Sequence, residues 1–226
     1  MVKTKSYKFD KEIRKDIEPL FISAFPREER PPVDYFFSSF DNNEINNLYG
    51  FYDKNDFIGF SSVIIYKDIC YIFFLAVEDE CRNKGYGTKI LNELKKLYKD
   101  YILLLCYEYL DKEHPEYETR KKREQFYLKN GFKKNPLITN EFGVVYQTAY
   151  IGNRKITFKD YQEIFKYGFG EYALKHLKEV KTYKAKCDYC LTEFEYIETS
   201  IDHRPWKKEG FVHCPKCGKE IRHIKK

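Results

Sequence analysis

The segment from Tyr71 to Lys99 constrains the fold most, because it joins a continuous apolar run to an amphipathic one through a short loop with two glycines. The run from Tyr71 to Val77 is rich in aromatic and β-branched residues, which predicts a strand buried on both faces. Apolar residues then recur at helical spacing among lysines and glutamates, namely Ile90, Leu91, Leu94 and Leu97. The segment therefore predicts a strand, a tight loop and a helix in succession.

The loop itself is Arg82-Asn83-Lys84-Gly85-Tyr86-Gly87. Glycines let the backbone turn tightly and approach a ligand, and the free N–H groups at a helix N-terminus favour an anion. Two glycines alone fit an ordinary strand-to-helix turn as well. The pattern differs from a Walker loop and from a dinucleotide-binding fingerprint, which need other residues at fixed spacings.

An Arg-x-x-Gly-x-Gly loop after a strand that ends in the acidic turn Glu78–Glu80 resembles the acetyl-CoA signature of the GCN5-related N-acetyltransferase (GNAT) family. The resemblance implies acetyl-CoA as cosubstrate, with the loop amides on its pyrophosphate and the end of the strand paired with its pantetheine arm. The cofactor-binding residues that it implies are Leu75, Ala76, Val77, Arg82, Asn83, Lys84, Gly85, Tyr86, Gly87 and Thr88.

The segment Tyr127-Leu128-Lys129-Asn130-Gly131-Phe132 resembles a second motif of the same family, Tyr-x-x-x-Gly-Phe. The resemblance implies that Tyr127 protonates the departing thiolate, and a phenol with a pKa near 10 suits that role. The alternative is that Tyr127 is one core aromatic among many. Many relatives carry an asparagine and an alanine upstream of this tyrosine that contact the pantetheine. This chain has Arg120 and Arg123 instead, which suit phosphates or an acidic substrate.

Acetyl transfer to an amine also requires a base for the ammonium, and a carboxylate acting directly or through water is the usual solution. Glu108 follows the apolar run Ile102–Tyr107 and is the candidate base. The alternative is that it is merely the first exposed residue after a strand. We expect direct attack by a primary amine of a small molecule or of a protein or peptide.

The order of elements predicts an α+β (α/β) chain with a mixed, mostly antiparallel central sheet flanked by helices, as in the GNAT fold. The predicted strands and helices are strand 5–9, a helix from residue 11 to near Pro26, helix 33–40, strands 48–52, 57–66 and 69–77, the helix after Gly87, strand 101–107, helix 116–130, and strands 132–137 and 144–150. Three strands joined by short turns predict an antiparallel meander, and the strand after the next helix should lie parallel to the last of them.

From the resemblance and the cysteine spacing we expect an acetyltransferase domain (1–150), a helical junction (151–184) and a small metal-binding domain (185–226). In the junction we expect a helix at 158–167, a break at Gly168–Gly170 and a further helical segment at 171–180.

Two CxxC pairs predict a metal site in the last domain, with the ligands Cys187, Cys190, Cys214 and Cys217. Four thiolates at this spacing can close a tetrahedron around zinc, and the segment resembles zinc-ribbon or rubredoxin-like knuckles. A pair of disulfides is the less favoured alternative, and zinc is preferred to iron because nothing else in the chain suggests electron transfer. Such a closed site is structural, and His203 and His213 are expected to be bystanders.

The net charge of +6 lies in the C-terminal third, since residues 151–226 hold 17 Lys and Arg against 11 Asp and Glu, whereas residues 1–150 hold 24 of each. A binding module without catalysis, in which the basic ribbon meets nucleic acid or a protein, is therefore the alternative to an enzyme; nucleic acid is possible but not favoured. No stretch is apolar enough to span a membrane and Met1–Asp10 has no apolar core, so we expect a cytoplasmic protein.

Overall fold

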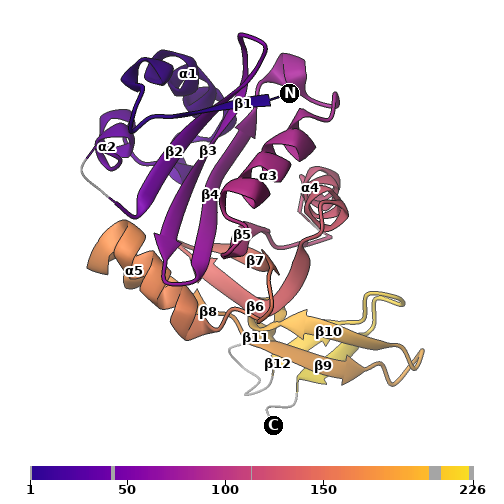
Figure 1. Cartoon of the computed structure of the whole chain (residues 1–226). Helices are drawn as coiled ribbons and strands as arrows, with labels where there is room; N and C mark the ends of the chain where they lie inside the picture. Colours follow the sequence, from indigo (N-terminus) through magenta and orange to yellow (C-terminus); the bar gives the residue numbers. More distant parts are fainter. Residues whose placement is uncertain (1, 42–43, 113, 204–209, 224–226) are drawn as a thin grey trace.

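The chain, as a computed structural model, is described over residues 2–41, 44–112, 114–203 and 210–223. Within these residues its centre is a mixed, mostly antiparallel eight-stranded sheet, in the order β1-β2-β3-β4-β5-β7-β6-β8 (Figure 1). The strands are β1 (Val2–Ser6), β2 (Asn46–Asp53), β3 (Asp56–Tyr66), β4 (Ile69–Val77), β5 (Ile102–Glu108), β6 (Lys133–Glu141), β7 (Val144–Ile151) and β8 (Leu177–Glu179). The α+β class and the mixed sheet expected from the sequence are confirmed.

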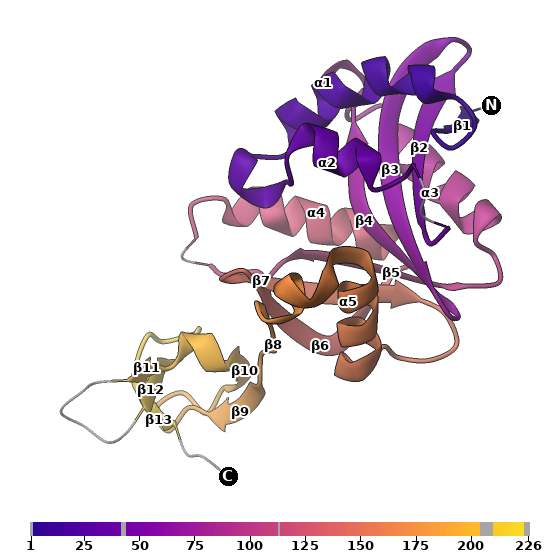
Figure 2. The same cartoon turned by 90° about the vertical axis from the view of Figure 1, so that its left-hand side faces the viewer.

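Helices cover both faces of the sheet (Figure 2). The helices α1 (Arg14–Ala24), α2 (Val33–Ser38) and α5 (Phe158–Leu174) lie on one face, and α3 (Tyr86–Leu97) and α4 (Tyr117–Lys129) on the other. On the first face Phe21 of α1 stacks on Phe36 of α2, with ring centroids 4.0 Å apart. On the second face α3 buries Ile90, Leu91 and Leu94, and each such side chain contributes about 1.5–3 kcal/mol when taken from water.

The strand pairing follows the predicted meander. β2, β3 and β4 pair antiparallel in chain order, and β5 pairs parallel with β4. The first strand was misplaced: β1 is Val2–Ser6 and not residues 5–9. The reason is burial, because Val2 is buried in the core whereas Phe9 is 87% exposed in the turn that follows.

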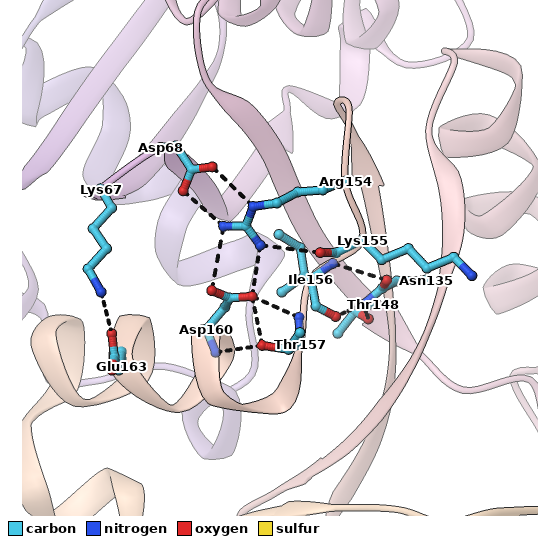
Figure 3. A network of polar contacts seen from close by, with 10 residues as sticks. All are labelled: Lys67, Asp68, Asn135, Thr148, Arg154, Lys155, Ile156, Thr157, Asp160 and Glu163. Carbon is cyan, nitrogen blue, oxygen red and sulfur yellow. Dashed lines mark hydrogen bonds and ion pairs between the residues drawn. The ribbon is translucent and has the colours of Figure 1, made fainter.

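A polar network fastens α5 to the sheet (Figure 3). Arg154 donates to both carboxylate oxygens of Asp68, which lies in the β3–β4 turn, and to Asp160 in the first turn of α5. Thr157 and Asp160 form a capping box at the start of α5, which satisfies amide donors that a helix N-terminus otherwise leaves unpaired. Asn135 of β6 donates to the carbonyl oxygen of Ile156, just before that cap. The start of α5 is thus tied both to the β3–β4 turn and to β6.

The rest of the junction differs from the expectation. The helix continues through Gly168, where a Cβ would lie 2.6 Å from Ile64 of β3, and it breaks at Gly170, whose φ is +79°. The predicted helical segment at 171–180 is wrong beyond residue 174, because Leu177–Glu179 is the edge strand β8 and pairs with β6. Tertiary pairing at a free sheet edge has overridden the local helical pattern.

The C-terminal segment holds two small sheets of its own, β10-β9 and β11-β12-β13. Their strands are β9 (Thr182–Lys186), β10 (Glu193–Ile197), β11 (Asp202–His203), β12 (Gly210–His213) and β13 (Glu220–His223). The N–H of Val180 donates to the carbonyl of Ile138 on β6, and these two side chains pack with Ile197 in one apolar cluster. This segment therefore adjoins the edge of the main sheet (Figure 1).

Candidate active site and candidate metal centre

A gap in the sheet sets the position of the candidate site. β4 and β5 pair only between residues 69–72 and 102–105, although β4 runs on to Val77 and β5 to Glu108. The two strands therefore diverge, and the main chain of the last residues of β4 faces the gap on that side. On its other side β4 stays against β3, where Gly59 allows the approach: a Cβ there would lie 2.3 Å from the Ala76 carbonyl oxygen. Leu75, Ala76 and Val77, which the family resemblance implies as partners of a pantetheine arm, thus lie beside this gap.

The glycine loop closes one end of this gap. Gly85 is the N-cap of α3 and has a φ of +81°, a left-handed conformation that glycine adopts without strain. No side chain of the described residues caps this helix, so the N–H groups of its first turn point outward without an intrahelical acceptor. Asn83 also has a positive φ, of 61°. The loop is therefore shaped to receive an anion.

Neighbouring residues hold this loop in place. A Cβ at Gly87 would lie 2.9 Å from the Phe126 ring of α4, so glycine lets the two helices meet there. The hydroxyl of Tyr86 donates to Asp53 at the end of β2, and this bond lowers the pKa of Asp53. These contacts fix the start of α3 against both α4 and β2.

The cations of the loop differ in their surroundings. Arg82 pairs with Asp79 at 2.6 Å and donates from Nε to the Val77 carbonyl oxygen at 3.3 Å, so it closes the turn after β4. Lys84 is exposed to solvent. Arg82 thus supports the loop, while Lys84 is available to a ligand.

Tyr127 lies in an aromatic cluster with Tyr107 of β5 and with Phe132. Its ring stacks on Tyr107 of β5 at 5.8 Å, at an interplanar angle of 22°, and meets Phe132 edge-on at 6.0 Å. Its hydroxyl makes no hydrogen bond to the residues that the structure describes, and burial raises the pKa of Tyr127 to about 12. The phenol therefore carries its proton at every ordinary working pH. Tyr107 is itself held by a hydrogen bond from its hydroxyl to Glu124 of α4.

Glu108, at the end of β5, forms an ion pair with Arg123 of α4, one helical turn before Tyr127. Burial acts to raise the pKa of Glu108, but the charge and hydrogen bond of Arg123 outweigh it, so the pKa lies below its ordinary value. The two candidate catalytic residues thus come together through α4. The sequence did not indicate that Arg123 would pair with the candidate base.

Two further charged residues share this region. Glu29 lies in the short turn Arg27–Glu29 between α1 and α2, and its pKa is raised by desolvation and by the charge of Glu108. Arg120, one turn before Arg123, lowers the pKa of both carboxyls. The sequence singled out Arg120 as a departure from the family pattern but offered no signal for Glu29, because only the fold brings residues 29 and 108 together.

The profile of the acetyltransferase (GNAT) domain family matches residues 44–134, a range that includes β4, the glycine loop, Glu108 and Tyr127. The chain carries a GNAT acetyltransferase domain. The resemblance identified from the sequence is thereby confirmed. A search of curated protein sequences gave no significant match.

Solved structures share the fold of this acetyltransferase domain. A GNAT-family putative acetyltransferase from Bacteroides thetaiotaomicron is 23% identical with a TM-score of 0.62, over 72% of this chain and 93% of that one. An aminoglycoside 6'-N-acetyltransferase complexed with coenzyme A is 18% identical, with a TM-score of 0.55 over 69% and 99%. A spermidine N-acetyltransferase mutant from Vibrio cholerae is 13% identical, with a TM-score of 0.52 over 66% and 92%.

The four predicted metal ligands come together beyond the acetyltransferase domain. The sulfur atoms of Cys187, Cys190, Cys214 and Cys217 all lie within 4.8 Å of one another, with two contacts of 3.6 Å. A tetrahedron with metal–sulfur bonds near 2.3 Å requires sulfur atoms about 3.8 Å apart. The cluster therefore fits a four-thiolate metal ion, and in the described structure no histidine belongs to it.

The two knuckles repeat one backbone pattern. The N–H of Leu191 donates to the carbonyl of Cys187, and the N–H of Gly218 donates in the same way to Cys214. Both residues have a positive φ, 59° at Leu191 and 70° at Gly218. Each loop is thus closed by the same hydrogen bond, from the fifth residue to the carbonyl of the first cysteine.

On the described β9–β10 hairpin of the C-terminal segment, positive and negative side chains alternate and do not form a uniformly basic surface. Lys186 lies opposite Glu193 and Lys184 opposite Glu195, and the latter two form an ion pair at 3.3 Å. Five of the basic residues behind the surplus charge, at positions 204, 207, 208, 225 and 226, lie outside the described residues. Among the residues described, no helix is long and apolar enough to cross a membrane.

Proposed function

We propose that the chain transfers the acetyl group of acetyl-CoA to a primary amine by direct attack on the thioester. The observation that carries this proposal is the alignment of the uncapped glycine loop, the gap between β4 and β5, and the half-buried phenol of Tyr127. The loop Arg82–Thr88 binds the pyrophosphate and the main chain of Leu75–Val77 pairs with the pantetheine arm. The thioester carbon is thereby brought to the side of the gap where Tyr127 and Glu108 lie.

In the reaction the amine nitrogen forms a bond to the acetyl carbon, and the carbon–sulfur bond breaks. Tyr127 gives its proton to the departing thiolate, whose basicity is comparable to that of a phenolate. The ammonium must lose a proton before attack, and Glu108 is the candidate base. Because its pKa is lowered by Arg123, Glu108 attracts the ammonium and relays the proton through water more readily than it retains it.

We also propose that the four cysteines hold one structural zinc ion. A closed set of four thiolates leaves no open position for a substrate, and the site lies outside the matched acetyltransferase range. The ion stabilises a segment that is too small to fold well alone.

The test is amine-dependent release of the CoA thiol from acetyl-CoA, measured with the purified chain and a panel of primary amines. We expect at least one amine to accelerate thiol release in proportion to enzyme concentration. Calorimetry with CoA is run in parallel. Binding of CoA without acceleration by any small amine or lysine-bearing peptide would contradict the proposal and favour a module that binds the cofactor without catalysis.

A further inference from the structure

A buried polar network lies under α5, in the otherwise apolar contact between this helix and the sheet. It consists of Glu141 and Thr139 of β6, Tyr71 of β4, Cys106 of β5 and Tyr161 of α5. Tyr161 is fully buried, and Tyr71 and Glu141 are 2% and 8% exposed. Apolar side chains of one core cluster surround both tyrosines. The matched range of the acetyltransferase family ends at residue 134, before Glu141 and Tyr161.

The hydrogen bonds of this network all point toward Glu141. Its Oε1 accepts from the hydroxyl of Thr139 at 2.7 Å and from that of Tyr161 at 2.8 Å. A tyrosine hydroxyl donates a single proton. The oxygen of Tyr161 therefore accepts from its other two partners, the hydroxyl of Tyr71 at 2.9 Å and the thiol of Cys106 at 3.0 Å. Four donors thus converge, directly or through one hydroxyl, on a single carboxylate oxygen.

Glu141 is a buried acid without a cation. Among the residues that the structure describes, no lysine, arginine or histidine forms an ion pair with it. Desolvation raises its pKa, and the hydroxyls of Thr139 and Tyr161 act against that rise. The residue opposite it on β8 is Leu177. Four titratable side chains lie within electrostatic range, from β4, β5, β7 and α5: Tyr71, Cys106, Tyr146 and Tyr161. A raised pKa brings a carboxylate closer to the value that suits a base at neutral pH.

Cys106 connects this network to the gap between β4 and β5. The last residue of β5 that pairs with β4 is Leu105, so Cys106 is the first residue beyond the paired part. Side chains alternate along a strand, so half-buried Cys106 shares a face with Glu108, two residues further on. Besides burial, a charge on Cys106 raises the pKa of Tyr127 and of Tyr146. The thiol therefore lies within electrostatic range of the candidate acid.

We propose that Glu141 is the final acceptor of the proton that the ammonium loses, and that Cys106 and Tyr161 carry the proton to it. This inference rests on the proposed acetyl transfer and completes its proton path. Glu108 remains ionised beside Arg123 and holds the ammonium at the entrance. Glu141 touches no atom of the substrate and acts through the two side chains between them.

Each step of this path exchanges one proton. The ammonium gives a proton to the sulfur of Cys106, directly or through one water, while the thiol gives its own to the oxygen of Tyr161. The phenol gives its proton to Oε1 of Glu141. Cys106 and Tyr161 end neutral, Glu141 ends as a carboxylic acid, and the free amine attacks the thioester. The proton returns to solvent along the same path after the product leaves.

Glu141→Gln tests the proposal, because the amide oxygen still accepts from Thr139 and Tyr161 but takes up no proton at working pH. With a base at this position, kcat/KM for the amine reaches a plateau in the neutral range. Without it, only amine that is already neutral reacts. We expect kcat/KM at pH 7 to fall by about 10²- to 10⁴-fold and to rise about tenfold per pH unit up to the pKa of the amine. CoA affinity should not change.

Further variants test the path and provide the control. Cys106→Ala and Tyr161→Phe each remove one step and should give the same steep pH dependence, whereas Cys106→Ser keeps a group that carries a proton and should restore part of the plateau. Glu163→Gln is the matched control. Glu163 also accepts from a tyrosine of the sheet, Tyr66, but its side chain is 33% exposed. This variant should keep the parental profile.

A second measurement needs no substrate. The folded pKa of Glu141 lies above its unfolded value, so the parent loses stability as the pH rises from about 4.3 through the folded pKa, and Glu141→Gln does not. The denaturant midpoint of Glu141→Gln should therefore increase relative to that of the parent between pH 4 and pH 8.

The proposal is overturned if that difference is constant with pH, or if folded Glu141→Gln or Tyr161→Phe keeps the parental plateau. In that case acetyl transfer itself still stands. Absence of amine-dependent turnover in a parent that binds CoA would overturn acetyl transfer, and this inference with it.

Discussion

A phenol that is to protonate a thiolate must arrive protonated and correctly oriented. At the scale of single residues, Tyr127 meets both conditions through its aromatic neighbours, since burial keeps the proton and the stacked ring of Tyr107 fixes the orientation. Tyr107 is itself fixed, because its hydroxyl donates to Glu124, and Glu124 forms an ion pair with Lys134 at 2.7 Å. The candidate acid is thus oriented by packing, and its hydroxyl is available for the proposed proton transfer.

Replacing Tyr127 by phenylalanine removes one hydroxyl and keeps the ring contacts. We expect kcat to fall by about 10²- to 10⁴-fold, the usual contribution of a general acid, with little change in CoA affinity. Steady-state kinetics and calorimetry on the same preparation measure the two effects. Tyr101→Phe, at the opposite end of β5, is the matched control and should retain parental turnover. Parental kcat in Tyr127→Phe would transfer the role to water or to another residue.

Glu108 gives a prediction that depends on pH. Its folded pKa is lowered, so its ion pair with Arg123 stabilises the protein above the unfolded glutamate value near 4.3 and loses that contribution as the pH falls through the folded pKa. Glu108→Gln should therefore unfold at lower denaturant concentration than the parent at pH 7, and the difference should vanish in acid. An equal difference at pH 7 and at pH 3 would show that the pair does not titrate as described.

At the scale of elements, the glycine loop works through its backbone conformation. Gly85 has a φ of +81°, but a Cβ there would meet nothing within 4 Å, so steric contact within the free protein does not require glycine. The requirement comes from the left-handed conformation, which costs an ordinary L-residue about 1–2 kcal/mol, and from the ligand that the exposed backbone receives.

Two substitutions at Gly85 separate the effect of the left-handed conformation from the effect of crowding the ligand. Gly85→Asn, which tolerates a positive φ, should weaken CoA binding only by crowding the pyrophosphate. Gly85→Val adds the strain of a β-branched residue and should weaken it further, by about tenfold relative to Gly85→Asn. Calorimetry with CoA measures both. Unchanged affinity in a folded Gly85→Val protein would remove the loop from the cofactor site.

The first cysteine knuckle also has a residue in the left-handed conformation, but this residue is a leucine and not a glycine. Leu191 is 68% exposed and has a φ of +59°, where its counterpart in the second knuckle is Gly218. We expect Leu191→Gly to stabilise the ribbon by about 0.5–1 kcal/mol, since relief of strain outweighs the added freedom of the unfolded chain. The measurement is the denaturant dependence of metal release to a coloured chelator. Leu191→Ala keeps the strain and serves as the control; equal stability of both variants would contradict the argument.

At the scale of the whole molecule, sequence patterns predicted the features that depend on residues close together in the chain. The buried run of β4, the stripe of α3 and the two CxxC spacings were sufficient for the central strand, the signature helix and the four clustered sulfurs. The edge strand β8, the shifted β1 and the pairing of Glu108 with Arg123 depend on contacts between distant segments, which a single sequence does not encode locally. For the same reason Glu29 was not found.

The residues proposed to bind zinc and those proposed to bind CoA lie in different parts of the chain. We therefore expect loss of the metal to destabilise the C-terminal segment and not the acetyltransferase domain. Every candidate metal ligand follows residue 186, whereas the glycine loop and Tyr127 precede residue 150. Four-ligand structural zinc contributes roughly 10–16 kcal/mol, more than so small a core supplies. We expect chelation to unfold the ribbon while CoA binding persists, as measured by hydrogen exchange and calorimetry. Elemental analysis should find one zinc per chain in protein purified without chelator, and its absence would contradict the proposal.

Transfer of a labelled acetyl group tests the central claim most directly. The purified chain is incubated with acetyl-CoA carrying a ¹³C-labelled acetyl group and with the amine that best accelerates thiol release. Mass spectrometry then follows the label. The account predicts one labelled acetyl group on the amine, formed by the parent and by Tyr101→Phe and nearly lost in Tyr127→Phe. Label that stays on CoA or appears only as free acetate, in protein that binds CoA, would contradict it.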